Sequence, residues 1–215
     1  MKNNNIIITI INMATQSNIE TTTSKFGTIT TIIGPMFCGK TKELTRLIDR
    51  KRIADKKCLI IKHSKDNRFD ADNKGLAHIT THCGSSYDKC DIVRYNTIDN
   101  DKVFASIISK YDVVGIDEGF FFKGICNFCN RLANNGIEVI VSTLDSSYKQ
   151  QLFSEIGDLI AISEHVIKLT AVCKLCKSEN GSFTIRTIDN NEEILVGSDD
   201  IYKSVCRSCL CAFNK

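Results

Sequence analysis

The sequence predicts an α/β protein in which helices cover both faces of a parallel sheet. Between residues 26 and 142, short apolar or β-branched runs alternate with segments whose apolar residues recur every three or four positions. Regular alternation of strand and helix is typical of parallel sheets. After residue 169 the composition changes to Cys, Lys, Ser, Gly and polar turns, which predicts a second, smaller unit.

Each expected element has its own local signal. The predicted strands, where apolar residues run together or alternate, span residues 26–33, 58–62, 113–116 and 139–142. The predicted helices, where apolar residues share one face, span residues 41–54, 103–108 and 125–133. Residues 1–25 are rich in Asn, Thr and Ile and show no period. We therefore expect a poorly ordered leader at 1–25, an α/β domain at 26–169 and a C-terminal domain at 170–215.

Composition narrows the class of protein. The 215 residues carry a formal net charge of +3, which gives no reason to expect a nucleic-acid partner. The longest apolar run near the start, residues 6–11, is too short to cross a membrane and lacks the features of a signal peptide. Eleven cysteines without a secretory signal are typical of thiols and metal ligands rather than disulfides. We expect a soluble protein of a reducing, cytoplasmic compartment with no membrane partner.

A phosphate-binding loop follows the first predicted strand. The segment Gly34-Pro35-Met36-Phe37-Cys38-Gly39-Lys40-Thr41 fits G-x-x-x-x-G-K-[ST] and leads into a predicted helix. In such a loop, backbone N–H groups surround phosphate oxygens, the lysine reaches the β- and γ-phosphates, and the hydroxyl ligates Mg²⁺. The sequence therefore predicts a nucleoside triphosphate site on a P-loop (RecA-like) parallel sheet.

Two adjacent carboxylates follow the predicted strand at 113–116. Asp117 occupies the strand tip, where P-loop proteins place an acidic residue near magnesium, and Glu118 comes next. Neighbouring side chains at a strand tip point in different directions. We therefore expect Asp117 to serve the metal and Glu118 to face a second substrate, where it can accept a proton from an attacking hydroxyl.

The C-terminal unit carries two C-x-x-C pairs. Cys173, Cys176, Cys206 and Cys209 supply four sulfurs on two tight turns, which suits tetrahedral zinc. A full set of four ligands leaves no open position, so the predicted zinc is structural. We expect a β-hairpin at 182–188 to fill the insert between the pairs. A third pair, Cys126 and Cys129, lies on a predicted helix and is expected to pack in the core.

Five stretches together resemble the type II thymidine kinases of animal cytosol, bacteria and poxviruses. They are GPMFCGK (34–40), KDNRF (65–69), GIDEG (115–119), LTAVC (169–173) and residues 202–209. The resemblance runs from about residue 28 to the C-terminus. It implies transfer of the γ-phosphoryl group of ATP to the 5′-hydroxyl of thymidine, and usually deoxyuridine, in nucleotide salvage for DNA synthesis.

The resemblance also implies roles for individual residues. Glu118 matches the catalytic base and Asp117 the magnesium-side carboxylate. Asp66 and Arg68 match a loop on the phosphate side, where Arg68, with Lys40, stabilises transferred charge. The implied pyrimidine contacts are Met36, Phe121, Leu144, Tyr148 and Tyr202, together with a lasso loop formed by Glu193, Ile194, Leu195, Val196 and Gly197. Family membership further implies a homotetramer and feedback inhibition by the end-product triphosphate.

Two alternatives to an active thymidine kinase stay open, one of which is motivated by a departure from the family pattern. Phe120 replaces the glutamine usual after DEG, which is compatible with a catalytically impaired relative that only binds nucleotide. A P-loop switch or motor whose zinc ribbon binds nucleic acid is the other alternative. The acidic segments at 189–193 and 199–200 argue against that second class, because a nucleic-acid surface is basic.

Overall fold

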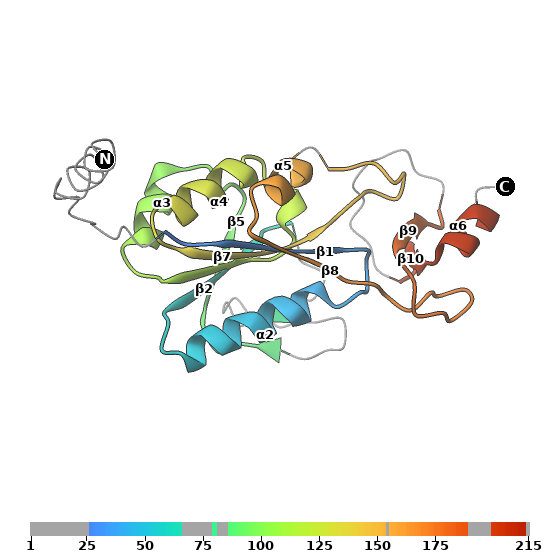
Figure 1. Cartoon of the computed structure of the whole chain (residues 1–215), viewed down its shortest axis with the longest axis horizontal. Coiled ribbons are helices and arrows are strands. Elements are labelled where there is room, and N and C mark those ends of the chain that lie inside the picture. The colour runs from blue at the N-terminus through green and yellow to red at the C-terminus, as the bar shows by residue number, and fades with distance from the viewer. Residues whose placement is uncertain (1–25, 66–78, 81–85, 154, 189–198, 214–215) are drawn as a thin grey trace, which may run out of the picture.

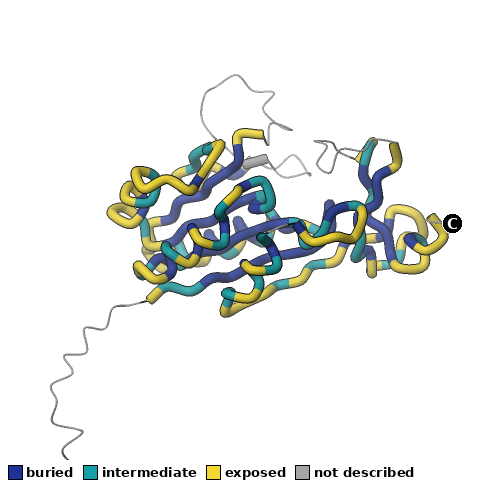
Figure 2. The backbone as a smooth tube through the Cα atoms, turned by 90° about the horizontal axis from the view of Figure 1, so that it is seen from above, coloured by how far each residue is buried: buried dark blue, intermediate teal, exposed yellow. Residues whose placement is uncertain are grey.

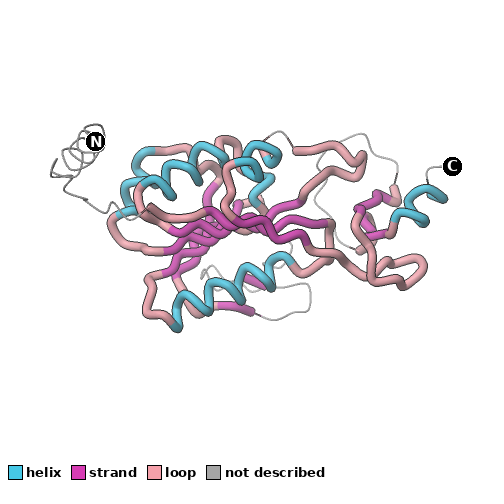
Figure 3. The backbone as a smooth tube through the Cα atoms, viewed as in Figure 1, coloured by secondary structure: helices cyan, strands magenta, loops and turns pink. Residues whose placement is uncertain are grey.

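A computed structural model describes residues 26–65, 79–80, 86–153, 155–188 and 199–213. Six parallel strands form one sheet (Figures 1 and 3). In spatial order they are β5 (Asp91–Tyr95), β2 (Cys58–His63), β6 (Val113–Ile116), β7 (Glu138–Leu144), β1 (Ile29–Gly34) and β8 (His165–Lys168). The predicted fold class, a parallel sheet flanked by helices, is confirmed.

Successive side chains of the central strands enter opposite apolar layers. Ile60 and Ile140 face the layer beneath α2 (Lys40–Ile53), whereas their neighbours Ile61 and Val141 face the other layer. That second layer is covered by α3 (Asp101–Ile108), α4 (Ile125–Asn134) and α5 (Ile156–Ala161), on the opposite side of the sheet from α2 (Figure 1). Figure 2 shows the buried backbone following the sheet through the middle of the molecule.

The C-terminal unit has its own small core. An antiparallel pair, β9 (Phe183–Arg186) and β10 (Tyr202–Val205), precedes α6 (Arg207–Phe213). The hairpin predicted within residues 182–188 is wrong, because that stretch is one strand whose partner is β10. Residues 183–187 contain none of the Gly, Asn or Asp residues that a tight hairpin turn requires. This unit lies beyond the carboxyl end of the sheet, next to the start of α2 (Figure 1).

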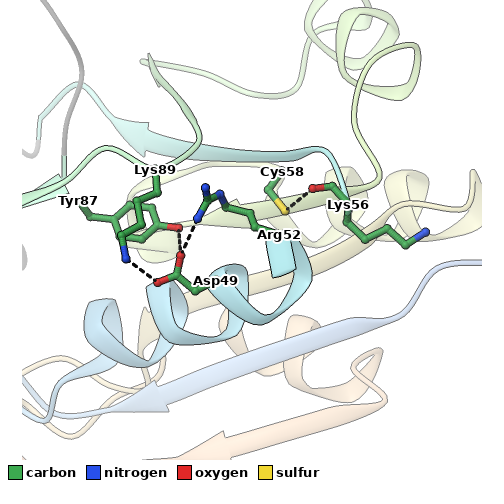
Figure 4. Close-up of polar contacts among 6 residues, drawn as sticks. All are labelled: Asp49, Arg52, Lys56, Cys58, Tyr87 and Lys89. Atoms are coloured by element: carbon green, nitrogen blue, oxygen red, sulfur yellow. Dashed lines mark hydrogen bonds and ion pairs between the residues drawn. The ribbon is translucent and has the colours of Figure 1, made fainter. Parts of the chain in front are cut away.

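A separate group of polar contacts ties α2 to a short strand pair, β3 (Ile79–Thr80) and β4 (Ser86–Tyr87). The Asp49 carboxylate accepts hydrogen bonds from the Tyr87 hydroxyl at 2.9 Å and from Arg52 at 3.0 Å, and it pairs with Lys89 at 3.5 Å (Figure 4). A cavity of about 300 Å³ lies beside this group, at the amino ends of β2 and β5. None of its lining residues belongs to the P-loop.

Gly34 is fixed by its surroundings as well as by its backbone. Its φ is 151°, and an added Cβ would lie 2.5 Å from the Leu169 carbonyl oxygen and 2.8 Å from the Cys38 sulfur. We expect Gly34→Ala to lower the free energy of unfolding by about 2–4 kcal/mol, or the melting temperature by about 5–10 °C, in nucleotide-free protein. Thermal denaturation followed by circular dichroism measures this.

The matched control is Gly39→Ala. Gly39 also has a positive φ of 85°, but an added Cβ there would meet nothing within 4 Å. Only the backbone strain of about 1–2 kcal/mol applies at that position. Equal destabilisation by the two substitutions would show that the contact with Leu169 does not constrain the loop.

Candidate active site

The predicted phosphate loop connects β1 to α2 at the carboxyl end of the sheet. Lys40 is buried, and its Nζ donates a hydrogen bond to the Pro35 carbonyl oxygen at 2.7 Å. The lysine therefore lies inside the loop, where an incoming phosphate can replace the carbonyl oxygen as its partner. Burial raises the pKa of the Cys38 thiol, although nearby Lys40 opposes the rise. Cys38 is thus a neutral thiol at neutral pH and adds no negative charge to the loop.

A buried carboxylate joins the loop to the neighbouring strands. Asp117 is 2% exposed, and Thr41 Oγ1 donates to its Oδ1 at 3.1 Å and its Oδ2 at 3.2 Å. The Ser142 hydroxyl, from the end of β7, donates to Asp117 Oδ1. Oxygen donors from a carboxylate and a hydroxyl are what Mg²⁺ prefers. Thr41 and Asp117 could hold that ion between the P-loop and β6.

Glu118 leaves the strand in a left-handed conformation. Its φ and ψ are 54° and 48°, which are unusual for a residue other than glycine and cost about 1–3 kcal/mol. The following Gly119 lies so close to β7 that an added Cβ would be 2.8 Å from Val141 Cγ1. Close packing of this turn holds the partly exposed Glu118 directly beside Asp117. Backbone strain maintained by the surroundings is typical of functional sites.

The aromatic residues after this turn pack on His63, at the carboxyl end of β2. Ring centroids of His63 lie 5.3 Å from Phe121 and 4.8 Å from Phe122. His63 Nδ1 accepts a hydrogen bond from the Lys65 backbone N–H at 3.0 Å, so the ring proton is on Nε2, which donates to the Asn96 carbonyl at 3.1 Å. His63 thus supports the ring of Phe121, a predicted pyrimidine contact.

Phe120, the departure from the family pattern, packs against the apolar core. Its ring centroid lies 4.2 Å from that of Phe121 and 5.0 Å from that of Phe153. Phe153 is buried in the layer between the sheet and α4. The substitution therefore extends the core, and it changes neither Asp117 nor Glu118.

The remaining predicted substrate contacts gather around the P-loop and β9. Leu144 is the register partner of Gly34, which places it at the same sheet edge as the loop. The Met36 backbone N–H donates to Thr184 Oγ1 at 3.0 Å in a buried contact between the loop and β9. Tyr148 and Tyr202 both contact Arg186 of β9. Asp66, Arg68 and the lasso residues 193–197 lie outside the described residues.

The four predicted zinc ligands come together at one point. All Sγ atoms of Cys173, Cys176, Cys206 and Cys209 lie within 4.8 Å of one another. Burial alone raises the pKa of the Cys173 thiol, but hydrogen bonds from the backbone N–H groups of Cys176 and Cys206 outweigh it and lower the pKa to about 6. Four converging sulfurs, one of them readily ionised, fit a tetrahedral zinc ion. Cys129, by contrast, is buried in the α4 core as predicted, whereas the prediction is wrong for Cys126, which is only partly buried and lies outside that core.

Several residues of this site were not found from the sequence. Ser142 could have been found, because it is a polar residue ending an apolar strand beside the predicted loop. His63, Thr184 and Arg186 carry no such signal, because their roles depend on contacts across long sequence separations.

Within the described part of the chain, no helix combines the length and apolarity needed to cross a membrane.

Comparison with known proteins finds similarity to thymidine kinases. A sequence model of the thymidine kinase family matches residues 27–210. A thymidine kinase of Acanthamoeba polyphaga mimivirus is 59% identical over 182 residues, covering 85% of this chain and 81% of that protein. Thymidine kinase 1 of Dictyostelium discoideum is 42% identical over 185 residues, covering 85% and 77% of the two chains. A thymidine kinase of vaccinia virus (strain Ankara) is 42% identical over 183 residues, covering 85% and 96%.

Proposed function

We propose that this chain, which belongs to the thymidine kinase family, transfers the γ-phosphoryl group of ATP to the 5′-hydroxyl of thymidine. Deoxyuridine, which differs by one methyl group, is proposed as a second substrate. The observation that carries the proposal is the hydrogen bond between Thr41 of the P-loop and Asp117, directly beside the strained Glu118. This arrangement supports a triphosphate site at the P-loop with the Glu118 carboxylate next to it as the proposed proton acceptor.

Each side chain has a distinct part in the proposed transfer. The loop N–H groups and Lys40 bind the β- and γ-phosphates, with Lys40 leaving the Pro35 carbonyl oxygen. Mg²⁺ between Thr41 and Asp117 would neutralise charge on those phosphates. Glu118 accepts the proton of the thymidine 5′-hydroxyl while the 5′-oxygen attacks the γ-phosphorus. The bond from that phosphorus to ADP breaks, and the products are thymidine monophosphate and ADP. Asp66 and Arg68 are proposed to stabilise the transferred group.

The proposed pyrimidine site lies between the sheet edge and the C-terminal unit. Leu144 and Phe121 supply apolar surface from the sheet side. Tyr148 and Tyr202, which both contact Arg186, supply two aromatic rings. The lasso residues 193–197 are proposed to cover the base. Structural zinc at the four cysteines would order this part of the chain.

The experiment that tests the function is phosphoryl transfer from ATP by reduced, zinc-replete protein. We expect turnover of thymidine and deoxyuridine to their monophosphates, with ADP released only when nucleoside is present. No turnover of either nucleoside would contradict the proposal. Salt-dependent binding of DNA or RNA, without thymidine-dependent ADP release, would instead support the nucleic-acid alternative.

Ser142 provides a sharper test of the proposed magnesium site. Ser142→Ala removes a buried hydrogen bond to the Asp117 carboxylate, a loss of about 1–2 kcal/mol. We expect the Mg²⁺ concentration for half-maximal rate to rise by up to about 5- to 30-fold, measured by magnesium titration at saturating ATP and thymidine. Ser106→Ala, at an exposed position on α3, is the control and should leave the titration unchanged. An unchanged midpoint for Ser142→Ala would argue against Asp117 as a ligand.

Family membership supports three further proposals. The chain is proposed to act in the cytoplasm as a homotetramer that its end-product triphosphate inhibits. Light scattering after size-exclusion chromatography tests the assembly. Inhibition of thymidine turnover by thymidine triphosphate, competed by thymidine, tests the feedback.

A further inference from the structure

Arg186 is a buried cation held between two tyrosines. It is 5% exposed, and its Nη2 donates a hydrogen bond to the Tyr202 hydroxyl at 2.7 Å. Its guanidinium carbon lies 3.9 Å from the centroid of the Tyr148 ring and 5.3 Å from that of the Tyr202 ring. Arginine is rarely buried without such partners, because removing its charge from water costs several kcal/mol. These contacts therefore constrain all three side chains together.

The two tyrosines belong to different parts of the fold. Tyr148 lies in the turn after β7, whose backbone is closed by hydrogen bonds from Ser147 N–H to the Gln151 carbonyl at 2.9 Å and from Gln150 N–H to the Ser147 carbonyl at 3.0 Å. Tyr202 begins β10 and is the register partner of Arg186 on β9. Arg186 thus connects a turn of the α/β sheet to the strand pair of the C-terminal unit.

That strand pair is also tied to the metal-ligand cluster and to the P-loop. Cys206 directly follows β10, and Thr184, two residues before Arg186, accepts the hydrogen bond from the Met36 N–H. Because residues i and i+2 of a strand share a face, Thr184 and Arg186 lie on the same side of β9. One side of β9 therefore contacts both the loop and the Tyr148 turn.

We propose that Arg186 is a positioning residue that sets the Tyr148 and Tyr202 rings for the nucleoside. The inference rests on the proposed function, which places both rings around the pyrimidine. Without the guanidinium, each ring loses one of the contacts that fix its orientation, and nucleoside binding must then supply that ordering. The Arg186 guanidinium contacts the two tyrosine rings, so we expect its replacement to change thymidine binding more than ATP binding.

The test compares Arg186→Met, Arg186→Lys and Tyr202→Phe in zinc-loaded protein. Methionine fills the space without charge or donors, and we expect the thymidine KM to rise about 10- to 100-fold, with kcat and the ATP KM within about threefold of wild type. Lysine keeps the charge without the planar guanidinium, and the rise in thymidine KM should be intermediate. Tyr202→Phe removes only the hydroxyl acceptor and should give about a 3- to 10-fold rise. Calorimetric titration with thymidine alone should show matching losses of affinity.

The control is Arg131→Met, which removes another stacked arginine, 4.2 Å from the Phe104 ring at the α3–α4 contact. It should leave the thymidine KM unchanged. A wild-type thymidine KM in Arg186→Met, or an equal rise in the KM for ATP, would overturn the inference while the proposed function stands. Absence of thymidine turnover in the wild-type protein would overturn both. If the Arg186→Met protein does not bind zinc or does not fold, the thymidine KM values of Arg186→Lys and Tyr202→Phe test the inference instead.

Discussion

Replacing Glu118 with glutamine is expected to lower kcat for thymidine by about 10²- to 10⁴-fold, the usual contribution of a general base. Glutamine has nearly the same shape as glutamate, and both require the same left-handed backbone at this position. The amide cannot take up the proton of the 5′-hydroxyl. Thymidine and ATP affinities should stay within about threefold of wild type, because the proposed base acts mainly as the new bond forms.

Single-turnover kinetics with saturating ATP and thymidine measure this effect free of product release. Glu138→Gln is the matched control, since Glu138 pairs with Lys51 at the opposite end of the same sheet. Its kcat should remain within about twofold of wild type. A near-normal rate for Glu118→Gln would show that another group accepts the proton.

The central part of the fold was predictable because burial on both faces leaves a clear sequence signal. All described residues of β1, β2 and β6 are buried, and each corresponds to an apolar or β-branched run. The edge strands β5 and β8 were not predicted, because strands exposed along one side mix polar with apolar residues. Pattern therefore identified the strands that carry the P-loop and Asp117, but not the limits of the sheet.

The candidate site was predictable to the same extent. The P-loop, Asp117 and the four cysteines each have a fixed local spacing, and the structure brings Thr41 to Asp117 and the four sulfurs together. The resemblance to the type II thymidine kinases is confirmed by the family match. Contacts between distant segments, such as Met36 with Thr184, have no local spacing and could only be found in three dimensions.

Removal of zinc is expected to abolish thymidine phosphorylation while leaving the α/β sheet folded. Among the residues that the structure describes, the core of the C-terminal unit consists of five buried residues, two of which are the ligands Cys173 and Cys206. So few apolar side chains cannot hold β9, β10 and α6 in place without a metal. Structural zinc sites contribute about 10–16 kcal/mol of apparent binding free energy, which is far more than this small core supplies.

Cys206→Ser is the corresponding substitution, and Cys211→Ser is its control, because Cys211 is exposed on α6 and outside the ligand cluster. We expect Cys206→Ser to lose bound zinc, measured by mass spectrometry, and thymidine turnover to fall at least about 100-fold. Cys211→Ser should retain both. Full turnover by zinc-free protein would contradict a structural role for the metal.

The chelated wild-type protein separates the effect of zinc from that of Arg186. Loss of the ion releases β9 as a whole, so the Met36–Thr184 and Tyr148–Arg186 contacts are lost together. Thymidine affinity should therefore fall further than in Arg186→Met, which keeps its zinc and its contact with the P-loop. Restoring zinc should return the thymidine KM to its wild-type value in the native chain but only to the raised value in Arg186→Met. This pattern is expected only if the metal acts on the nucleoside through β9.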